Sequence, residues 1–129
     1  MLDTSIISDV IRSPQGTSAR RIAKLGEASI CTSIIVAAEL RYGVARRGSE
    51  RLRLAVEDVL SEIVILPFKG PADIEYGDIR TRLEAAGKTI GGNDLLIAAH
   101  ARAVGATLVT AHTGEFRRVP GLTVENWLT

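Results

Sequence analysis

Apolar residues recur along this chain at spacings that distinguish helices from strands. In residues 49–62 and 72–86 they recur every three or four positions, which predicts two amphipathic helices. Residues 28–32 and 63–66 are short, largely apolar runs that predict buried strands. The same criteria predict a short first strand that ends at residue 3, helices at residues 6–11, 17–26, 33–47 and 93–104, and strands at residues 107–110 and 122–125.

The order of these elements predicts the fold class. Strands separated by helices indicate a parallel sheet with helices on both faces, because parallel strands need long crossover connections. We therefore expect an α/β fold in three layers (α/β/α) around a central parallel sheet of about four to five strands. The helix over residues 93–104 is apolar nearly all round, so it should be central.

Length and composition favour a single domain over residues 1–129. A chain of this length with 46% hydrophobic residues fills one core. No run approaches the roughly 18 consecutive apolar residues of a membrane span, and no signal-type segment opens the chain. We therefore expect a cytoplasmic protein with no membrane partner. Cys31 is the one cysteine, and a buried core thiol is its expected role.

Three acids stand inside apolar runs, at Asp3, Glu39 and Asp94. Burying a carboxylate is costly unless a cation neutralises it, and none of the three has Lys or Arg at the helical i±3 or i±4 positions. Oxygen ligands of this kind select hard ions such as Mg²⁺ or Mn²⁺. The expected sheet would gather them, since ligands bind outside the carboxyl ends of parallel strands.

Each acid also has a structural interpretation that the sequence leaves open. Asp3 could be a helix cap, and either Asp94 or Asn93 could cap the apolar helix. Glu39 could be a helix acid whose stem is buried and whose head is in water. His100 lies within the apolar helix and is expected to be a core or interface histidine.

A set of motifs, in a fixed order, spans nearly the whole chain. It comprises Leu-Asp-Thr-Ser at residues 2–5, Ala-Glu-Leu-Arg-Tyr-Gly at 38–43, Asn-Asp-Leu-Leu-Ile-Ala-Ala-His-Ala at 93–101, Leu-Val-Thr at 108–110 with Glu-Phe at 115–116, and a Trp-containing end at 119–127. The chain thereby resembles the PIN-domain family, specifically its VapC-type toxins. The resemblance implies a metal-dependent endoribonuclease, the toxin of a type II toxin–antitoxin pair, that cleaves RNA, forms a homodimer and is inhibited by a VapB-like antitoxin.

The resemblance also implies the site. Asp3, Glu39 and Asp94 match the family's metal-binding acids, and Thr4 or Ser5 matches the position beside the first. At the fourth position the family has an acid or often Asn, whereas this chain has His112. Histidine suits softer transition metals better than it suits Mg²⁺, so His112 is a candidate metal ligand or a bystander of the loop.

Two rival functions follow from the same residues. With His112 in the fourth place, the chain could be a degenerate PIN domain that only binds RNA or an antitoxin. An aspartyl-phosphate enzyme would need a second Asp where Ser5 stands. Net charge is only +1, but just three of the 16 basic residues are lysine and the rest are arginine. The cluster Arg41, Arg46, Arg47, Arg51 and Arg53 could contact RNA phosphates, contact acidic groups of an antitoxin, or form a solvated face.

Overall fold

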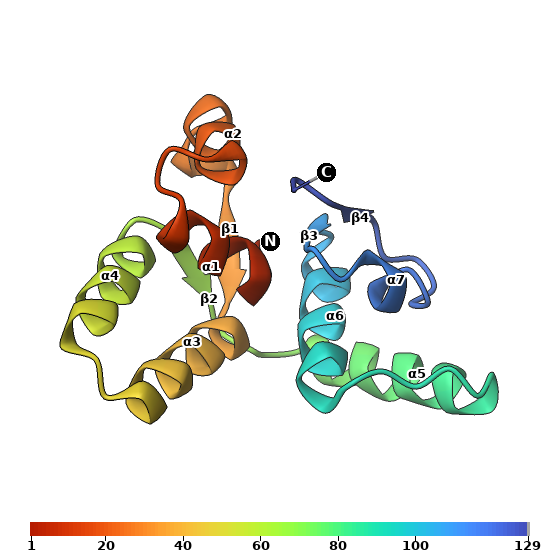
Figure 1. Ribbon diagram of the computed structural model, residues 1–129. Coiled ribbons are helices and arrows are strands. Elements are labelled where there is room, and N and C mark those ends of the chain that lie inside the picture. Colours follow the sequence, from red (N-terminus) through yellow and green to blue (C-terminus); the bar gives the residue numbers. More distant parts are fainter. Residues whose placement is uncertain (129) are drawn as a thin grey trace.

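The computed structural model describes residues 1–128, in which helices alternate with short parallel strands. The helices are α1 (Thr4–Arg12), α2 (Thr17–Leu25), the 3₁₀ turn η1 (Glu27–Ser29), α3 (Ile34–Arg47), α4 (Glu50–Ser61), α5 (Ala72–Ala85), α6 (Gly92–Val104) and α7 (Thr113–Phe116). The strands are β1 (Cys31–Ser33), β2 (Val64–Leu66), β3 (Leu108–Val109) and β4 (Val124–Glu125). In Figure 1, α1 to α4 surround β1 and β2, while α6 and α7 lie near β3 and β4 and α5 packs against α6.

The strands form two parallel pairs with the N-terminus between them. β1 pairs with β2, and β3 pairs with β4, both in parallel. Leu2 forms parallel bridges to Thr32 on one side and to Val109 on the other. The N-terminus therefore lies between β1 and β3 (Figure 1), and the carboxyl ends of three neighbouring extended segments meet just after Leu2.

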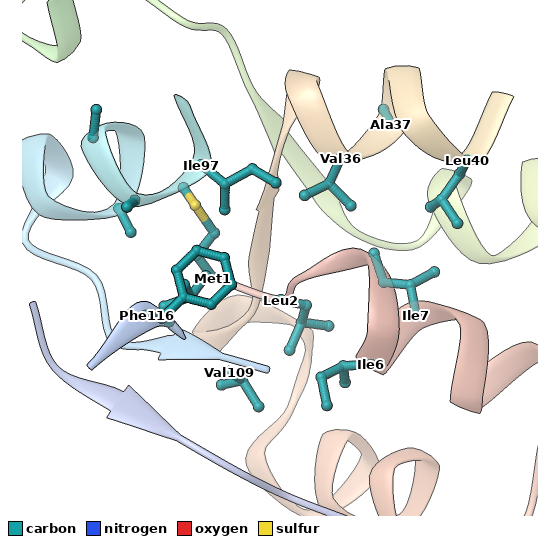
Figure 2. Packing of buried hydrophobic residues seen from close by; sticks show 14 of the residues in the cluster. Met1, Leu2, Ile6, Ile7, Val36, Ala37, Leu40, Ile97, Val109 and Phe116 are labelled. Atoms are coloured by element: carbon teal, nitrogen blue, oxygen red, sulfur yellow. The ribbon is translucent and has the colours of Figure 1, made fainter. Parts of the chain in front are cut away.

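A single cluster of buried apolar side chains joins the part of the chain around β1 and β2 to the part around β3 and β4. Leu2, Ile6, Ile7 and Ile97 are 0 to 1% exposed, and Phe116 is 0% exposed. Figure 2 shows side chains of α1, α3 and α6 converging on Met1 and Leu2 from different directions. Burial of one such side chain stabilises the fold by roughly 1.5–3 kcal/mol. The cluster fixes the ends of α1, α6 and α7 that carry the predicted site.

Helix ends follow local capping chemistry. The Asp3 carboxylate accepts a hydrogen bond from the backbone N–H of Thr4 at the start of α1. Ser33 caps α3 through the N–H of Ile35, and Ser49 caps α4 through the N–H of Leu52. Side-chain oxygens at these positions satisfy N–H groups that have no partner inside the helix.

The structure corrects two of the predicted elements. Residues 28–32 are not all strand, because Gly26 (φ 85°) turns the chain into η1 and the strand begins only at Cys31. The predicted first strand is reduced to the bridges of Leu2, since α1 starts directly after Asp3. The four-residue helix α7 is too short to have an apolar period and was not expected.

Two single-residue expectations have clear outcomes. Cys31 is half-buried and packs against the apolar cluster. His100 is 1% exposed, and its Nδ1 atom shares a 2.7 Å hydrogen bond with Oγ of Ser33, which confirms the core role. Burial lowers the pKa of the His100 imidazole, and a hydrogen bond with the backbone of Pro67 opposes that shift. None of the helices described over residues 1–128 is long and apolar enough to cross a membrane.

Candidate metal site

Asp3 is the most deeply buried of the predicted site acids. Its side chain is held by three donors: the backbone N–H of Thr4 at 2.8 Å, Oγ1 of Thr110 at 2.7 Å and Oγ of Ser5 at 3.4 Å. Asp3 is 3% exposed and Thr110 is 0% exposed. Hydrogen bonds of this kind hold a buried carboxylate in one orientation. The cap interpretation of Asp3 is therefore correct as well, since one carboxylate caps α1 and lines the site.

Glu39 lies on α3 and is half-buried. Its Oε1 atom accepts a hydrogen bond of 2.7 Å from the Thr4 hydroxyl, and its Oε2 atom accepts one of 3.3 Å from the Asn93 amide. The head group therefore does not simply project into water. It points across to α1 and to the first turn of α6.

Asp94 stands in that first turn and is half-buried. Burial raises the pKa of its carboxyl to about 6; the charge of Asp3, a hydrogen-bonding contact with Glu115 and the charge of Glu39 act in the same direction. The cap interpretation of Asp94 is wrong, because α6 begins after Gly91 without a side-chain cap. Asp94 instead faces other acids.

These side chains line one pocket of about 330 Å³, formed by Asp3, Thr4, Ser5, Glu39, Asp94, His112 and Glu115. The four predicted residues thus come together from α1, α3, α6 and the start of α7. No Lys or Arg is among the residues that line this pocket. A pocket with four carboxylates and no cation of its own has an excess of negative charge, which favours a bound cation.

Glu115 is the site residue that the sequence did not reveal. It follows His112 by three residues on α7 and is placed by the buried Phe116 beside it. The Glu-Phe pair at residues 115–116 belongs to the ordered set of motifs, and that membership was the one sequence signal that could have pointed to Glu115. His112 is exposed; its backbone N–H donates to Oγ1 of Thr110, and its side chain lines the pocket.

The carboxylates do not form a finished ligand set. Within residues 1–128, no three His, Cys, Asp or Glu side chains are arranged to hold a metal ion. The oxygens of Asp3 and Glu39 accept hydrogen bonds from neighbouring donors instead. Their assignment as metal ligands, with His112, stays a prediction.

A groove of about 350 Å³ continues from this pocket between α1, α3 and α4. Thr4 and Glu39 line both the pocket and the groove. Its apolar side chains are Ile11, Leu40, Val44, Leu52 and Val56. Arg12, Arg46 and Arg47 also line it, and none of them forms an ion pair within the described part of the chain. Arg41 and Arg53 differ, because they pair with Glu57 and Glu50.

Comparison with known proteins identifies the family. The family model for the PIN domain matches residues 1–122. This chain belongs to the PIN-domain family. Within that family it is 41% identical over 129 residues to Ribonuclease VapC2 of Rickettsia felis, covering 98% of this chain and 96% of the relative.

One further relative and one solved structure add detail. The tRNA(fMet)-specific endonuclease VapC of Shigella flexneri is 37% identical over 128 residues, covering 98% of this chain and 96% of that protein. The crystal structure of VapBC2 from Rickettsia felis bound to a DNA fragment from their promoter contains a chain that superposes with a TM-score of 0.92 at 40% identity. The match covers 98% of this chain and 97% of that chain.

Proposed function

We propose that this PIN domain is a metal-dependent endoribonuclease, the toxin of a type II toxin–antitoxin pair. The observation that carries the proposal is the pocket in which Asp3, Glu39, Asp94 and Glu115 meet without a basic side chain. Support comes from relatives of nearly equal length that are named ribonucleases.

The oxygen donors that line the pocket match the chemistry of a hard divalent cation, with Mg²⁺ or Mn²⁺ as the proposed ion, and binding would draw the carboxylates into a closer ligand set. Asp3, Glu39 and Asp94 would hold it, Glu115 would extend the set, and His112 is a further candidate. Mutual repulsion and burial already raise the pKa of Asp94 to about 6, which a bound cation would reverse. When bound, such an ion supplies a Lewis acid for a phosphate oxygen and lowers the pKa of a coordinated water.

The hydroxyl groups around the acids have positioning roles in this proposal. Thr4 donates to Glu39, and Thr110 donates to Asp3. Ser5 donates to Asp3 and accepts from the N–H of Ala111, so its oxygen is occupied on both sides. These bonds fix the first two acids before substrate arrives, which reduces the reorganisation that binding an ion requires.

We also propose a VapB-like antitoxin as partner. The solved relative from Rickettsia felis is a VapBC2 complex. The groove beside the pocket suits a protein segment that carries both apolar and acidic side chains, because apolar residues and three unpaired arginines line it. A segment seated there would reach Glu39, so binding and inhibition would be coupled.

The same proposal also covers the arrangement of the sheet, the oligomeric state and the cellular location. The two strand pairs and Leu2 would act as one parallel sheet, in the order β4, β3, Leu2, β1, β2, inside a three-layer α/β/α domain. A homodimer is expected, and light scattering of the purified chain tests it. An RNA substrate would place its action in the cytoplasm.

The test is cleavage of RNA by the purified chain, with total RNA and initiator tRNA as substrates. Cleavage should require Mg²⁺ or Mn²⁺, stop with EDTA, and fall by more than about 100-fold in Asp94→Asn, since the ion contributes several kcal/mol to the transition state. RNA binding without cleavage in the parent protein would instead support the non-catalytic alternative. Equal activity of parent and Asp94→Asn would contradict the site.

A further inference from the structure

Asn93 makes a contact that its place in the sequence does not explain. It belongs to the first turn of α6, next to Asp94, yet its side-chain amide donates to Oε2 of Glu39, 54 residues earlier on α3. The N···O distance is 3.3 Å. One residue therefore ties an acid of α3 to the turn that carries an acid of α6.

A role in stabilising α6 does not explain why asparagine stands at position 93. The helix begins after Gly91, and no side chain caps it. Asn93 is exposed and already inside the helix, where asparagine is a poorer helix former than alanine. A bystander at this position would leave its amide in water rather than on a carboxylate of another element.

The contact opposes a force that acts within the pocket. Glu39 and Asp94 line the same pocket, which no Lys or Arg lines, so the two carboxylates repel each other when no cation lies between them. Thr4 holds one oxygen of Glu39 from α1, and Asn93 holds the other from α6. Without the amide, only the Thr4 hydroxyl would hold Glu39, and its Oε2 atom would be free to turn away from Asp94.

We propose that Asn93 is a positioning residue that keeps Glu39 beside Asp94, so that acids from two separate helices can share one divalent cation. This inference rests on the proposed metal site. Groups that orient metal ligands typically change metal affinity by about 10–100-fold when removed. Asn93 should therefore act on ion affinity while leaving the stability of the metal-free fold unchanged.

The test compares Asn93→Leu, which keeps the shape and removes the donor, with Asn93→Gln, which keeps an amide. Mn²⁺ binding to the purified proteins is measured by titration calorimetry, without RNA. Asn93→Leu should bind Mn²⁺ about 10-fold more weakly, and Asn93→Gln should recover part of that loss. Melting temperatures in EDTA should agree between the three proteins. RNA cleavage by Asn93→Leu should approach the parent rate at saturating Mn²⁺, because only positioning is lost.

A double-mutant cycle with Glu39→Ala tests whether Asn93 acts on Mn²⁺ affinity through Glu39. In that background Asn93→Leu should have no further effect on Mn²⁺ affinity. An effect of full size there, equal weakening by Leu and Gln, or unchanged affinity in Asn93→Leu would overturn the role of Asn93 while leaving the metal site standing. If the parent itself binds no Mn²⁺, the proposed site fails, and this inference fails with it.

Discussion

Asp3 and Asp94 line the same pocket but lie in opposite environments. Asp3 is surrounded by hydrogen-bond donors from Thr4, Ser5 and Thr110. Asp94 has other acids as its neighbours and the raised pKa that follows from burial and repulsion. Asp3 therefore finds its hydrogen-bond partners within the protein, whereas a cation from outside would favour the charged form of Asp94.

This difference predicts a pH dependence of stability in the metal-free protein. Because the folded-state pKa of Asp94 is raised from 3.8 to about 6, the native state binds a proton more tightly than the unfolded state does. Its stabilising contribution is present at low pH and is lost as the pH rises from about 4 through about 6. Urea unfolding in EDTA at a series of pH values measures the loss, and Asp94→Asn should flatten it.

A second buried group, His100, also makes stability depend on pH, in the opposite direction, and must be separated from the effect of Asp94. His100 has a lowered pKa, so its contribution is present above the ordinary histidine value of about 6.5 and is lost as the pH falls from there through the lowered folded-state pKa. The difference between parent and Asp94→Asn removes that background. Parallel curves for the two proteins would show that Asp94 carries no raised pKa.

A second prediction at this scale concerns His112. If its imidazole helps to hold an ion, His112→Asp should shift the preference toward Mg²⁺, because a carboxylate offers hard oxygen, and the parent should gain more from Mn²⁺. The change in the ratio of cleavage rates should be about 10-fold or more, which corresponds to roughly 1.4 kcal/mol. Rates with each ion between pH 6 and 8 decide it; identical ratios and pH profiles would make His112 a bystander.

At the scale of elements, Arg102 connects three parts of the chain. From α6 its guanidinium donates to Glu75 at 2.6 Å and Asp78 at 2.6 Å on α5, and to the carbonyl of Pro120 at 2.9 Å beyond α7. The Arg102 side chain is 15% exposed. These bonds hold α6, with Asp94 at its start, against α5 and the segment that follows Glu115.

Arg102→Met should therefore destabilise the protein by about 2–4 kcal/mol, because it leaves partly buried acids and a carbonyl without their partner. Arg82→Met is the matched control, since Arg82 also pairs with Asp78 but its side chain is 61% exposed. That change should cost less than about 1 kcal/mol. Urea unfolding of the two variants measures both effects, and equal losses would show that burial of Arg102 has no part in its role.

The elements also show how far the sequence could predict the fold. The helix expected over residues 49–62 is α4 (Glu50–Ser61) with Ser49 as its cap, because a long apolar period and a capping residue are both local signals. The strands are only two or three residues long, and such lengths depend on pairing partners that are distant in sequence.

Some residues of the candidate site could likewise be predicted from the sequence, and others could not. Asp3, Glu39 and Asp94 could be found because a charge inside an apolar run is visible locally, and the pocket brings them together. Glu115 was missed, since α7 is too short for an apolar period and Glu115 itself is exposed rather than set in an apolar run. The contact of Asn93 with Glu39 depends on how α3 and α6 meet, which no local pattern specifies.

At the scale of the whole molecule, the acidic pocket and the groove form one continuous surface. This surface is negatively charged in the pocket and positively charged in the groove. Acids line the pocket, and Arg12, Arg46 and Arg47 line the groove beyond Glu39. A substrate phosphate needs the pocket with its cation, whereas an acidic protein segment is attracted to the arginines. Cleavage and inhibition should therefore be separable by mutation.

Arg47→Ala tests this separation. It should weaken binding of the proposed VapB-like antitoxin by about 5–30-fold, as loss of one interface arginine costs roughly 1–2 kcal/mol, and should leave the proposed RNA cleavage by the free chain unchanged. Arg53→Ala is the control, because Arg53 is paired with Glu50 and does not line the groove. Antitoxin affinity by titration calorimetry and cleavage rates are measured for both variants. If Arg47→Ala lowers cleavage and leaves antitoxin affinity intact, the groove belongs to the RNA path and the inhibitor binds elsewhere.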